Sequence, residues 1–464
     1  MEPLTLTKVA QLANGLLVQG DGKEIVTRVS TDSRTLQPGD LFVPLRGENF
    51  DGHKFVAQAS ERGAVGAMVE ESWKGAAPDA FALIRVSDTL AAYQSLATNY
   101  RRSLPLKAVV ITGSNGKTST KDFVAATLSR GFRVTKTEGN FNNHVGLPQT
   151  MLGASASDEI AVWEIGMNHP GEIAALSKLA APDVAIITNV GLAHIEFMGS
   201  REAIAAEKGA LAEAVGAEGT VILNADDPYS QGIAGRTRAK VILAGIENGF
   251  VRATEVTQSA SGCEFTILEG AHRCRAQLPV PGIHMVQNAM LAVAAGRAFG
   301  LSLEDCAAGL ASTPLTKARL QIKEINGIQF IDDSYNANPD SMKAALRTLV
   351  ELDADGRRVA VLGQMSELGE ESERGHREVG EAAAAFGIDE LIAVGATGAT
   401  MARAAHQAGL QKSTAVAEPE EAAGLLRETA SPGDLILVKG SRSARMERVL
   451  EAFSKRQSTA EVTP

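Results

Sequence analysis

Several residue types are scarce in this chain of 464 residues, and each shortage excludes a class of protein. Only three cysteines are present, and because none forms a CxxC pair we expect neither a disulfide framework nor a metal site at Cys263, Cys274 and Cys306. No run reaches the roughly 18 apolar residues of a membrane helix, and the first 15 residues lack the basic and apolar parts of an export signal. We therefore expect a cytoplasmic protein that does not insert into a membrane.

Positive charge is also in short supply. The 45 lysines and arginines against 55 aspartates and glutamates give a formal net charge of −10. Nucleic acids and acidic membrane surfaces attract basic protein faces, so neither is an expected partner. A single nucleotide needs only a few local donor groups, so binding one is compatible with this net charge. The 44% of hydrophobic residues is ordinary for a globular protein, and the length exceeds what one core supports, which predicts about two to four domains.

The strongest positive signal is a glycine-rich turn between a predicted strand, 108–111, and a predicted helix, 120–130. Two glycines let the backbone aim its N–H groups at a phosphate, and the helix N-terminus adds positive potential. Lys117 would reach the outer phosphates of a nucleotide, and the Thr118 hydroxyl would hold magnesium. Only two residues separate the glycines instead of the common four, and the alternative is an ordinary strand-to-helix turn. The predicted ATP contacts here are Gly113, Ser114, Asn115, Gly116, Lys117, Thr118 and Ser119.

The pattern of strands, helices and prolines divides the chain into three blocks. Residues 1–104 mix short strands and helices and end beside Pro105, which favours a hinge. Residues 105–316 alternate apolar strands with helices, as parallel sheets do, and include a strand-rich excursion over 251–278. Residues 317–464 repeat the alternation without a phosphate loop. We predict an α/β protein of three domains: a mixed α/β N-terminal domain, a central P-loop parallel-sheet ATPase domain and a C-terminal Rossmann-like domain.

The first block contains a short polar segment, Ser30-Thr31-Asp32-Ser33-Arg34. Turn chemistry between two strands explains it. Arg34 beside hydroxyl groups would equally suit a phosphorylated ligand. On local grounds the two interpretations are equally favoured.

Six motifs, in this order, resemble the Mur ligases of peptidoglycan synthesis. They read DSRTLQPGDLFVPLRGENFDGHKF, TGSNGKTST, TEGNFNNHVGLPQT, WEIGMNHPGEI, DDSYNANPDSM and KGSRSARME. The similarity extends from about residue 30 to 449 and leaves the tail after Phe453 outside. The chain departs from the family at Gln364, where an aspartate is usual, and at Met285, where relatives carry a second polar residue. It lacks the Asp-Asn-Pro-Arg signature of members that add one amino acid, and most resembles the members that add a dipeptide.

The resemblance implies an ATP-dependent, ADP-forming ligase. In this family a substrate carboxylate attacks the γ-phosphate of ATP, and an amine displaces the resulting acyl phosphate through a tetrahedral intermediate. The implied substrates are UDP-N-acetylmuramoyl-tripeptide and D-alanyl-D-alanine, and the implied product is the UDP-N-acetylmuramoyl-pentapeptide precursor of the cell wall. ATP, two magnesium ions, a monomeric enzyme and closure of the third domain over the second are implied with them.

The resemblance also implies a set of catalytic residues. Glu164 follows a predicted strand, and in open α/β sheets ligands bind at the carboxyl ends of strands. The catalytic group would be Lys117, Glu164, His194 and Lys208, and magnesium would be held by Thr118, Glu164, His194 and a Lys208 carbamylated by carbon dioxide. The alternatives are a solvated Glu164, a structural His194 and a surface Lys208.

The remaining implied contacts come from loops and from the third block. Asn288, Arg319, Asp333 and Tyr335 would contact ATP, although Arg319 would also suit a hinge salt bridge. The UDP-sugar-peptide would contact Ser33, Arg34, Asn140, Asn142, Asn143, Asn168 and His169, although the asparagine run would also suit a plain loop. The reacting ends and the dipeptide would contact Asn336, Asn338, Lys439, Ser441 and Arg442.

Two other functions are compatible with parts of this pattern. One is a relative that adds a single amino acid, such as another Mur ligase or a folylpolyglutamate synthetase; the missing Asp-Asn-Pro-Arg signature and the UDP-type first block weigh against these. The other is an inactive nucleotide-binding partner. Retention of Lys117, Glu164, His194 and Lys208 weighs against it.

Overall fold

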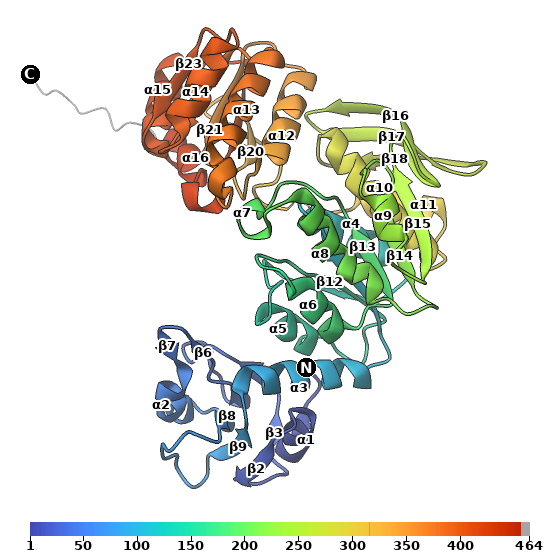
Figure 1. The fold of residues 1–464 in the computed structure, drawn as a ribbon, viewed down its shortest axis with the longest axis vertical. Coiled ribbons are helices and arrows are strands. Elements are labelled where there is room, and N and C mark those ends of the chain that lie inside the picture. Colours follow the sequence, from blue (N-terminus) through green and yellow to red (C-terminus); the bar gives the residue numbers. More distant parts are fainter. Residues whose placement is uncertain (315, 456–464) are drawn as a thin grey trace, which may run out of the picture.

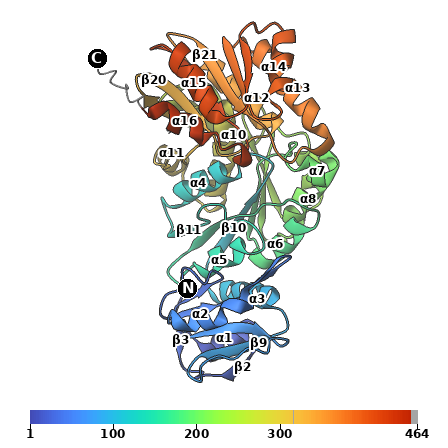
Figure 2. The ribbon, with the colours of Figure 1, turned by 90° about the vertical axis from the view of Figure 1, so that its left-hand side faces the viewer.

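The computed structural model describes residues 1–314 and 316–455. The three predicted domains follow one another along the long axis of the molecule, with the N-terminal domain at one end and the C-terminal domain at the other (Figures 1 and 2). Each is built around its own sheet, so the predicted three-domain α/β architecture is confirmed. The boundaries at residues 104 and 316 stay predictions. Residues 456–464 of the predicted third domain lie outside the described residues.

The N-terminal domain is a five-stranded mixed sheet with helices. Strand order is β2-β9-β8-β5-β4, with β2 antiparallel to β9 and the other neighbours parallel. Its elements are β1 (Leu4–Thr5), α1 (Leu6–Leu12), β2 (Leu16–Gln19), β3 (Ile25–Val26), β4 (Arg28–Ser30), β5 (Asp40–Phe42), β6 (Arg46–Gly47), β7 (Phe50–Asp51), η1 (Gly52–Phe55), α2 (Val56–Glu61), β8 (Gly66–Glu70), β9 (Ala82–Val86) and α3 (Thr89–Ser103).

The central domain contains a nine-stranded sheet of order β11-β12-β10-β13-β14-β15-β16-β17-β18. Strands β11 to β16 pair in parallel and the last pairs are antiparallel, as the strand-rich excursion predicts. Its elements are β10 (Lys107–Thr112), α4 (Lys117–Leu128), β11 (Val134–Lys136), α5 (Gly146–Leu152), β12 (Ile160–Glu164), α6 (Glu172–Ala180), β13 (Val184–Ile187), α7 (Ile195–Met198), α8 (Arg201–Glu213), β14 (Thr220–Asn224), α9 (Ser230–Ala234), β15 (Lys240–Gly245), β16 (Val251–Ser259), β17 (Gly262–Glu269), β18 (His272–Leu278), α10 (Ile283–Ala298) and α11 (Leu303–Ala311).

The C-terminal domain is a six-stranded sheet of order β19-β20-β24-β21-β22-β23, antiparallel only between β19 and β20. Its elements are β19 (Gln321–Ile325), β20 (Ile328–Asp333), α12 (Pro339–Glu351), β21 (Arg358–Gly363), η2 (Gly369–Glu371), α13 (Ser372–Ala385), β22 (Glu390–Val394), α14 (Gly398–Gln407), β23 (Ser413–Val416), α15 (Pro419–Thr429), β24 (Leu435–Lys439), η3 (Arg442–Ala444) and α16 (Glu447–Ser454).

The central sheet explains where a ligand can bind. Strand β10 lies between β12 and β13, so the connections leave it toward opposite sides of the sheet. Such a switch point opens a crevice at the carboxyl ends of the strands. The three strands are buried along their length except at Lys107, as strands covered on both faces are. Within the described residues, no helix combines the length and apolar character needed to cross a membrane.

The helix after the glycine turn begins earlier than the sequence pattern indicates. The prediction started it at residue 120, whereas α4 begins at Lys117. Gly116 precedes it in the left-handed region, with φ of 78°, which lets the chain turn directly from the loop into the helix. The first turn of α4 therefore includes residues of the predicted phosphate loop.

Candidate functional site

A cavity of about 840 Å³ lies between the central and C-terminal domains. The central domain contributes the loops that follow β10, β12 and β13, and the C-terminal domain contributes the loops that follow β20 and β24. The predicted site residues that line it are Ser114, Asn115, Gly116, Lys117, Thr118, Ser119, Asn140, Asn142, Asn143, Glu164, Asn168, His194, Asn288, Arg319, Asp333, Tyr335, Asn336, Asn338, Lys439, Ser441 and Arg442. The structure therefore brings together groups that are far apart in the sequence.

The glycine turn is hydrogen-bonded to the loop that follows β13. The Asn115 backbone N–H donates to the Asn189 side chain over 2.9 Å, and the Asn115 carbonyl accepts from Thr188 Oγ1 over 2.5 Å. A Cβ on Gly113 would lie 1.8 Å from Thr188 Oγ1, so only glycine fits at that position. These contacts between the two loops fix the shape of the glycine turn.

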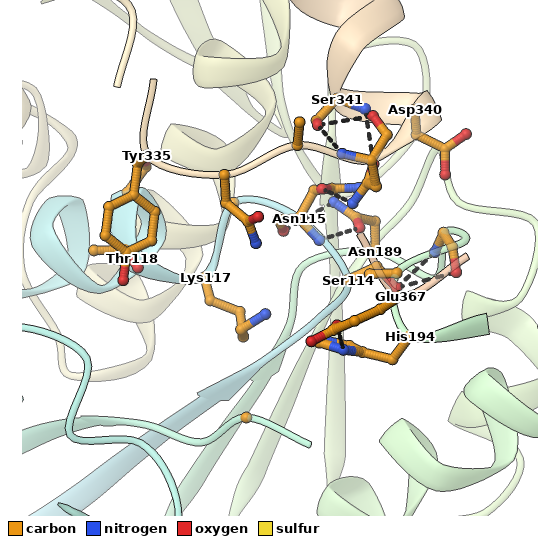
Figure 3. Close-up of a pocket in the computed structure, with 18 of the residues that line it drawn as sticks. Ser114, Asn115, Lys117, Thr118, Asn189, His194, Tyr335, Asp340, Ser341 and Glu367 are labelled. Atoms are coloured by element: carbon orange, nitrogen blue, oxygen red, sulfur yellow. Dashed lines mark hydrogen bonds and ion pairs between the residues drawn. The ribbon is translucent and has the colours of Figure 1, made fainter. Parts of the chain in front are cut away.

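Lys117 projects from this turn into the cavity (Figure 3). Its Nζ donates to the Gly113 carbonyl over 2.8 Å. Burial lowers the pKa of Lys117, the carboxylates of Glu164 and Glu367 oppose that shift, and Arg319 adds to it. A cation among partly compensating charges is suited to receive an anionic phosphate.

Gly116 offers a test of the predicted nucleotide site. A Cβ at this position would lie 2.6 Å from the side-chain amide of Asn288, on a backbone that L side chains rarely adopt. We expect Gly116→Ala to weaken ATP binding about tenfold or more. The new methyl group would displace the Asn288 side chain, and the left-handed backbone at residue 116 would carry about 1–2 kcal/mol of strain. Calorimetric titration with a non-hydrolysable ATP analogue measures the effect.

Gly387→Ala is the matched control for that variant. Gly387 has a similar φ of 74° but nothing within 4 Å of its would-be Cβ, so it carries the strain without the contact. It should bind the analogue like the wild type. Equal affinities in all three proteins would contradict the assignment of Gly116 and Asn288 to the ATP site.

Glu164 lies at the end of β12, 3% exposed, with its carboxylate in the cavity. Its two oxygens accept from neutral donors, Thr118 Oγ1 over 2.9 Å and Asn142 Nδ2 over 2.8 Å. No ion pair among the described residues holds this carboxylate, and its direct hydrogen-bond donors are neutral, so it keeps a negative charge that suits a cation. Hydroxyl and carboxylate oxygens are ligands that Mg²⁺ prefers.

The described residues contain no group of three or more His, Cys, Asp or Glu side chains arranged as a complete metal site. Magnesium usually takes one or two carboxylates and completes its shell with water and substrate phosphates. The pair of Glu164 and Thr118 fits that pattern. His194 lines the same cavity and adds a ring nitrogen.

Lys208 lies on α8 and is 1% exposed, so the alternative of a surface lysine is excluded. It does not line the cavity, and no hydrogen bond joins its Nζ to another described residue. Burial lowers its pKa well below the usual value, and the charge of Lys117 adds to the effect. This environment favours the neutral amine over the charged ammonium form.

The C-terminal domain adds its own polar groups to the cavity. Arg319 donates to Thr118 Oγ1 over 3.3 Å and stacks on the Tyr335 ring, 4.4 Å from its centre. That contact replaces the alternative of a hinge salt bridge for Arg319. Lys439 Nζ donates to Asp333 Oδ2 over 2.6 Å and to the Asn336 carbonyl over 3.0 Å.

The residues that line the cavity without a role assigned from the sequence include His284, Asp340 and Glu367, of which Asp340 lies in a motif discussed above. Burial lowers the pKa of His284 to about 4, so the ring is neutral near pH 7. Asp340 accepts from the Leu192 backbone N–H over 3.0 Å. Glu367 lies beside His194, and its contact with that ring lowers the pKa of the carboxyl.

The three asparagines of the run 140–143 have different roles, one in local structure and two at the cavity. Asn143 Oδ1 accepts from the backbone N–H groups of Val145 and Gly146 at the start of α5. Asn142 holds Glu164, while Asn140 is exposed at the cavity edge. The backbone N–H groups of Asn168 and His169 both donate to Glu172, and the His169 ring does not line the cavity.

Ser33 and Arg34 lie in the N-terminal domain and outside this cavity. The Arg34 side chain is 83% exposed and forms an ion pair with Asp32 at 2.8 Å, which lowers the pKa of Asp32 to about 2. The backbone N–H of Arg34 also donates to Asp32, as in a turn. Both interpretations of this segment therefore stay open.

Comparison with known proteins agrees with this architecture along the chain. Family models match over residues 25–101 (Mur ligase family, catalytic domain), 111–296 (Mur ligase middle domain) and 318–442 (Mur ligase, glutamate ligase domain). The UDP-N-acetylmuramoyl-tripeptide–D-alanyl-D-alanine ligase of Bacillus subtilis is 40% identical over 450 residues, covering 96% of this chain and 97% of its own.

Two solved structures extend the comparison to three dimensions. MurF from Acinetobacter baumannii superposes with a TM-score of 0.91 at 33% identity, over 98% of this chain and 100% of its own. MurF ligase from Thermotoga maritima in complex with ADP superposes with a TM-score of 0.81 at 29% identity, over 92% and 97%. The chain belongs to the Mur ligase family.

Proposed function

We propose that this chain joins D-alanyl-D-alanine to UDP-N-acetylmuramoyl-tripeptide with hydrolysis of ATP to ADP, and so forms UDP-N-acetylmuramoyl-pentapeptide. The observation that carries the proposal is the match to ligases named for this reaction over 96% of the chain or more, at 40% and 37% identity for the relatives of Bacillus subtilis and Escherichia coli. The ATP-dependent peptide ligase activity is favoured over both alternatives raised by the sequence.

Each predicted domain has a part in this proposal. Residues 1–104 hold the UDP end of the first substrate, residues 105–316 hold ATP and magnesium, and residues 317–464 bring the dipeptide. We also propose that the enzyme acts as a monomer. We place the enzyme in the cytoplasm, where its nucleotide substrates are found.

Phosphoryl transfer depends on positioning and on neutralising charge that spreads over the phosphate oxygens. The backbone of the glycine turn holds the phosphates, Lys117 meets the transferring group, and Arg319 approaches from the C-terminal domain. Thr118, Glu164 and His194 are the residues that would hold magnesium, which when bound adds positive charge at the phosphates. The docked C-terminal domain excludes water from the acyl phosphate, which hydrolyses readily.

Lys208 is suited to one covalent step, carbamylation. Its neutral amine nitrogen attacks the carbon of carbon dioxide, a C–O π bond opens to take the electron pair, and the nitrogen loses a proton. The product is an anion whose oxygens are of the type that Mg²⁺ prefers. The observations that support this proposal are the burial of Lys208, its missing hydrogen bonds among the described residues and its lowered pKa.

The substrates are tested by mixing them in all combinations. We expect ADP formation only when ATP, magnesium, UDP-N-acetylmuramoyl-tripeptide and D-alanyl-D-alanine are present together, because the amine must displace the acyl phosphate. Coupled ADP detection with mass spectrometry of the product measures this, using tripeptides that end in either meso-diaminopimelate or lysine.

Two outcomes would contradict the proposal in different ways. A protein that adds meso-diaminopimelate or lysine to the UDP-dipeptide and ignores D-alanyl-D-alanine would be a different Mur ligase. A protein that binds ATP and releases no ADP under any combination would be the inactive nucleotide-binding partner.

A further inference from the structure

We propose that Glu367 is a positioning residue for His194, and that the docked C-terminal domain thereby completes a magnesium site that belongs to the central domain. The inference rests on the proposed role of His194 as a magnesium ligand. Glu367 comes from the loop after β21 and His194 from the loop after β13, so the contact joins two domains.

The first observation is the contact itself. His194 Nδ1 lies 2.5 Å from Glu367 Oε2, and Figure 3 shows the two side chains facing each other beside Lys117. Nδ1 is buried and its only polar neighbour in the part of the chain that the structure describes is this carboxylate, in a close ion-pair contact whose angle is not that of a hydrogen bond. No hydrogen bond from another described residue occupies Nε2. Metal-ligating histidines commonly place one ring nitrogen against a carboxylate, which fixes the ring and leaves the other nitrogen for the metal. Glu367 is placed as that carboxylate.

The second observation is the backbone on both sides of the contact. His194 and Glu367 are both in the left-handed region, with φ of 63° and 60°. Non-glycine residues persist there only where the surroundings enforce the conformation, and such residues concentrate at functional sites. Here the Glu196 backbone N–H donates to the Glu367 carbonyl over 3.4 Å. The two strained turns therefore hold each other across the domain boundary.

The third observation is that the loop carrying His194 is bound by the C-terminal domain at a second point. The Leu192 N–H donates to Asp340 Oδ2 over 3.0 Å, two residues before His194. Helix α7, directly after His194, packs against η2 of the C-terminal domain. Because the Glu367 contact exists only when the domains are docked, metal binding and docking must stabilise each other by the same free energy.

The experiment measures metal binding directly in the full chain. Mn²⁺ serves as the probe, with a non-hydrolysable ATP analogue, and electron paramagnetic resonance counts bound ions and their affinities. The wild type should bind two ions. Glu367→Gln keeps the size of the side chain and removes its negative charge, and should weaken one ion about 10–100-fold while leaving the other unchanged.

Two controls separate positioning from other effects. Glu370→Gln removes an exposed carboxylate three residues away that does not line the cavity, and should bind both ions like the wild type. Asp340→Asn weakens docking at the same loop without touching His194, and should change Mn²⁺ affinity less than Glu367→Gln does. Circular dichroism of each variant verifies that the fold is kept.

The outcomes distinguish this inference from the proposed function. If His194→Ala loses one Mn²⁺ ion while Glu367→Gln binds both Mn²⁺ ions as tightly as the wild type, the positioning role is wrong and the metal role of His194 stands. If His194→Ala retains both ions at full affinity, both assignments are wrong. If Asp340→Asn weakens the ion as much as Glu367→Gln does, docking alone explains the effect and the positioning role is wrong.

Discussion

Lys117→Ala is expected to lower ADP formation about 1,000-fold or more while the protein stays folded. The side chain is the cation of the glycine turn and projects into the cavity between the domains. Removing one preorganised group that stabilises developing charge costs about 10²–10³ in turnover, and Lys117 supplies a full charge to the transferring phosphoryl group. Steady-state ADP release with all substrates present measures the loss.

The control for this variant is Lys240→Ala, which removes an exposed lysine at the start of β15. It should turn over like the wild type. Thermal unfolding of Lys117→Ala within a few degrees of the wild type would show that the loss is chemical. Near-normal phosphate release by well-folded Lys117→Ala protein would make the assignment of the ATP site wrong.

The parts of the site that the sequence predicts well are those set by local order along the chain. A strand, a glycine turn and a helix must place Lys117 at the carboxyl end of a parallel strand, and the structure has β10, the turn and α4 in that order. Glu164 follows the same rule at the end of β12. In both cases the direction of the side chain follows from the element that carries it.

The parts that the sequence could not predict depend on contacts between distant residues. Glu367 and Asp340 contact the central domain from the C-terminal domain, and no periodicity in the sequence indicates which loops meet there. Asn142 and Asn143 are neighbours of the same type, yet one holds Glu164 and the other caps α5. Only the fold of the loop separates those two roles.

Lys208 lies between these two cases, because the pattern of apolar residues around it indicates that its side chain is buried. Ile204, Leu211 and Ala212 lie three or four residues away on the same face of α8 and are buried with it. A lysine on the apolar face of a helix is unusual, since burial of a charged amine is costly. Burial on that face favours a neutral or chemically modified lysine, and the lowered pKa agrees with the first of these.

Lys208→Ala is expected to be nearly inactive, with turnover partly restored by a small carboxylate such as formate or acetate that fills the vacated space. If the carbamate is the active form, Lys208→Arg should also be nearly inactive, because an arginine is positively charged and cannot form a carbamate near neutral pH. Depletion of bicarbonate should lower the activity of the wild type and leave both variants unchanged. These three responses separate a carbamate from an unmodified lysine.

A density map decides the point more directly than mass spectrometry, because carbamates are lost in acid. Crystals grown with ATP and bicarbonate should show three additional atoms on Lys208 Nζ. An unmodified amine in such crystals, together with an active Lys208→Arg enzyme, would make the carbamate proposal wrong. Lys208 would then be a buried amine that Lys117 and its surroundings keep neutral, and magnesium would have to be held by Thr118, Glu164 and His194 with the phosphates alone.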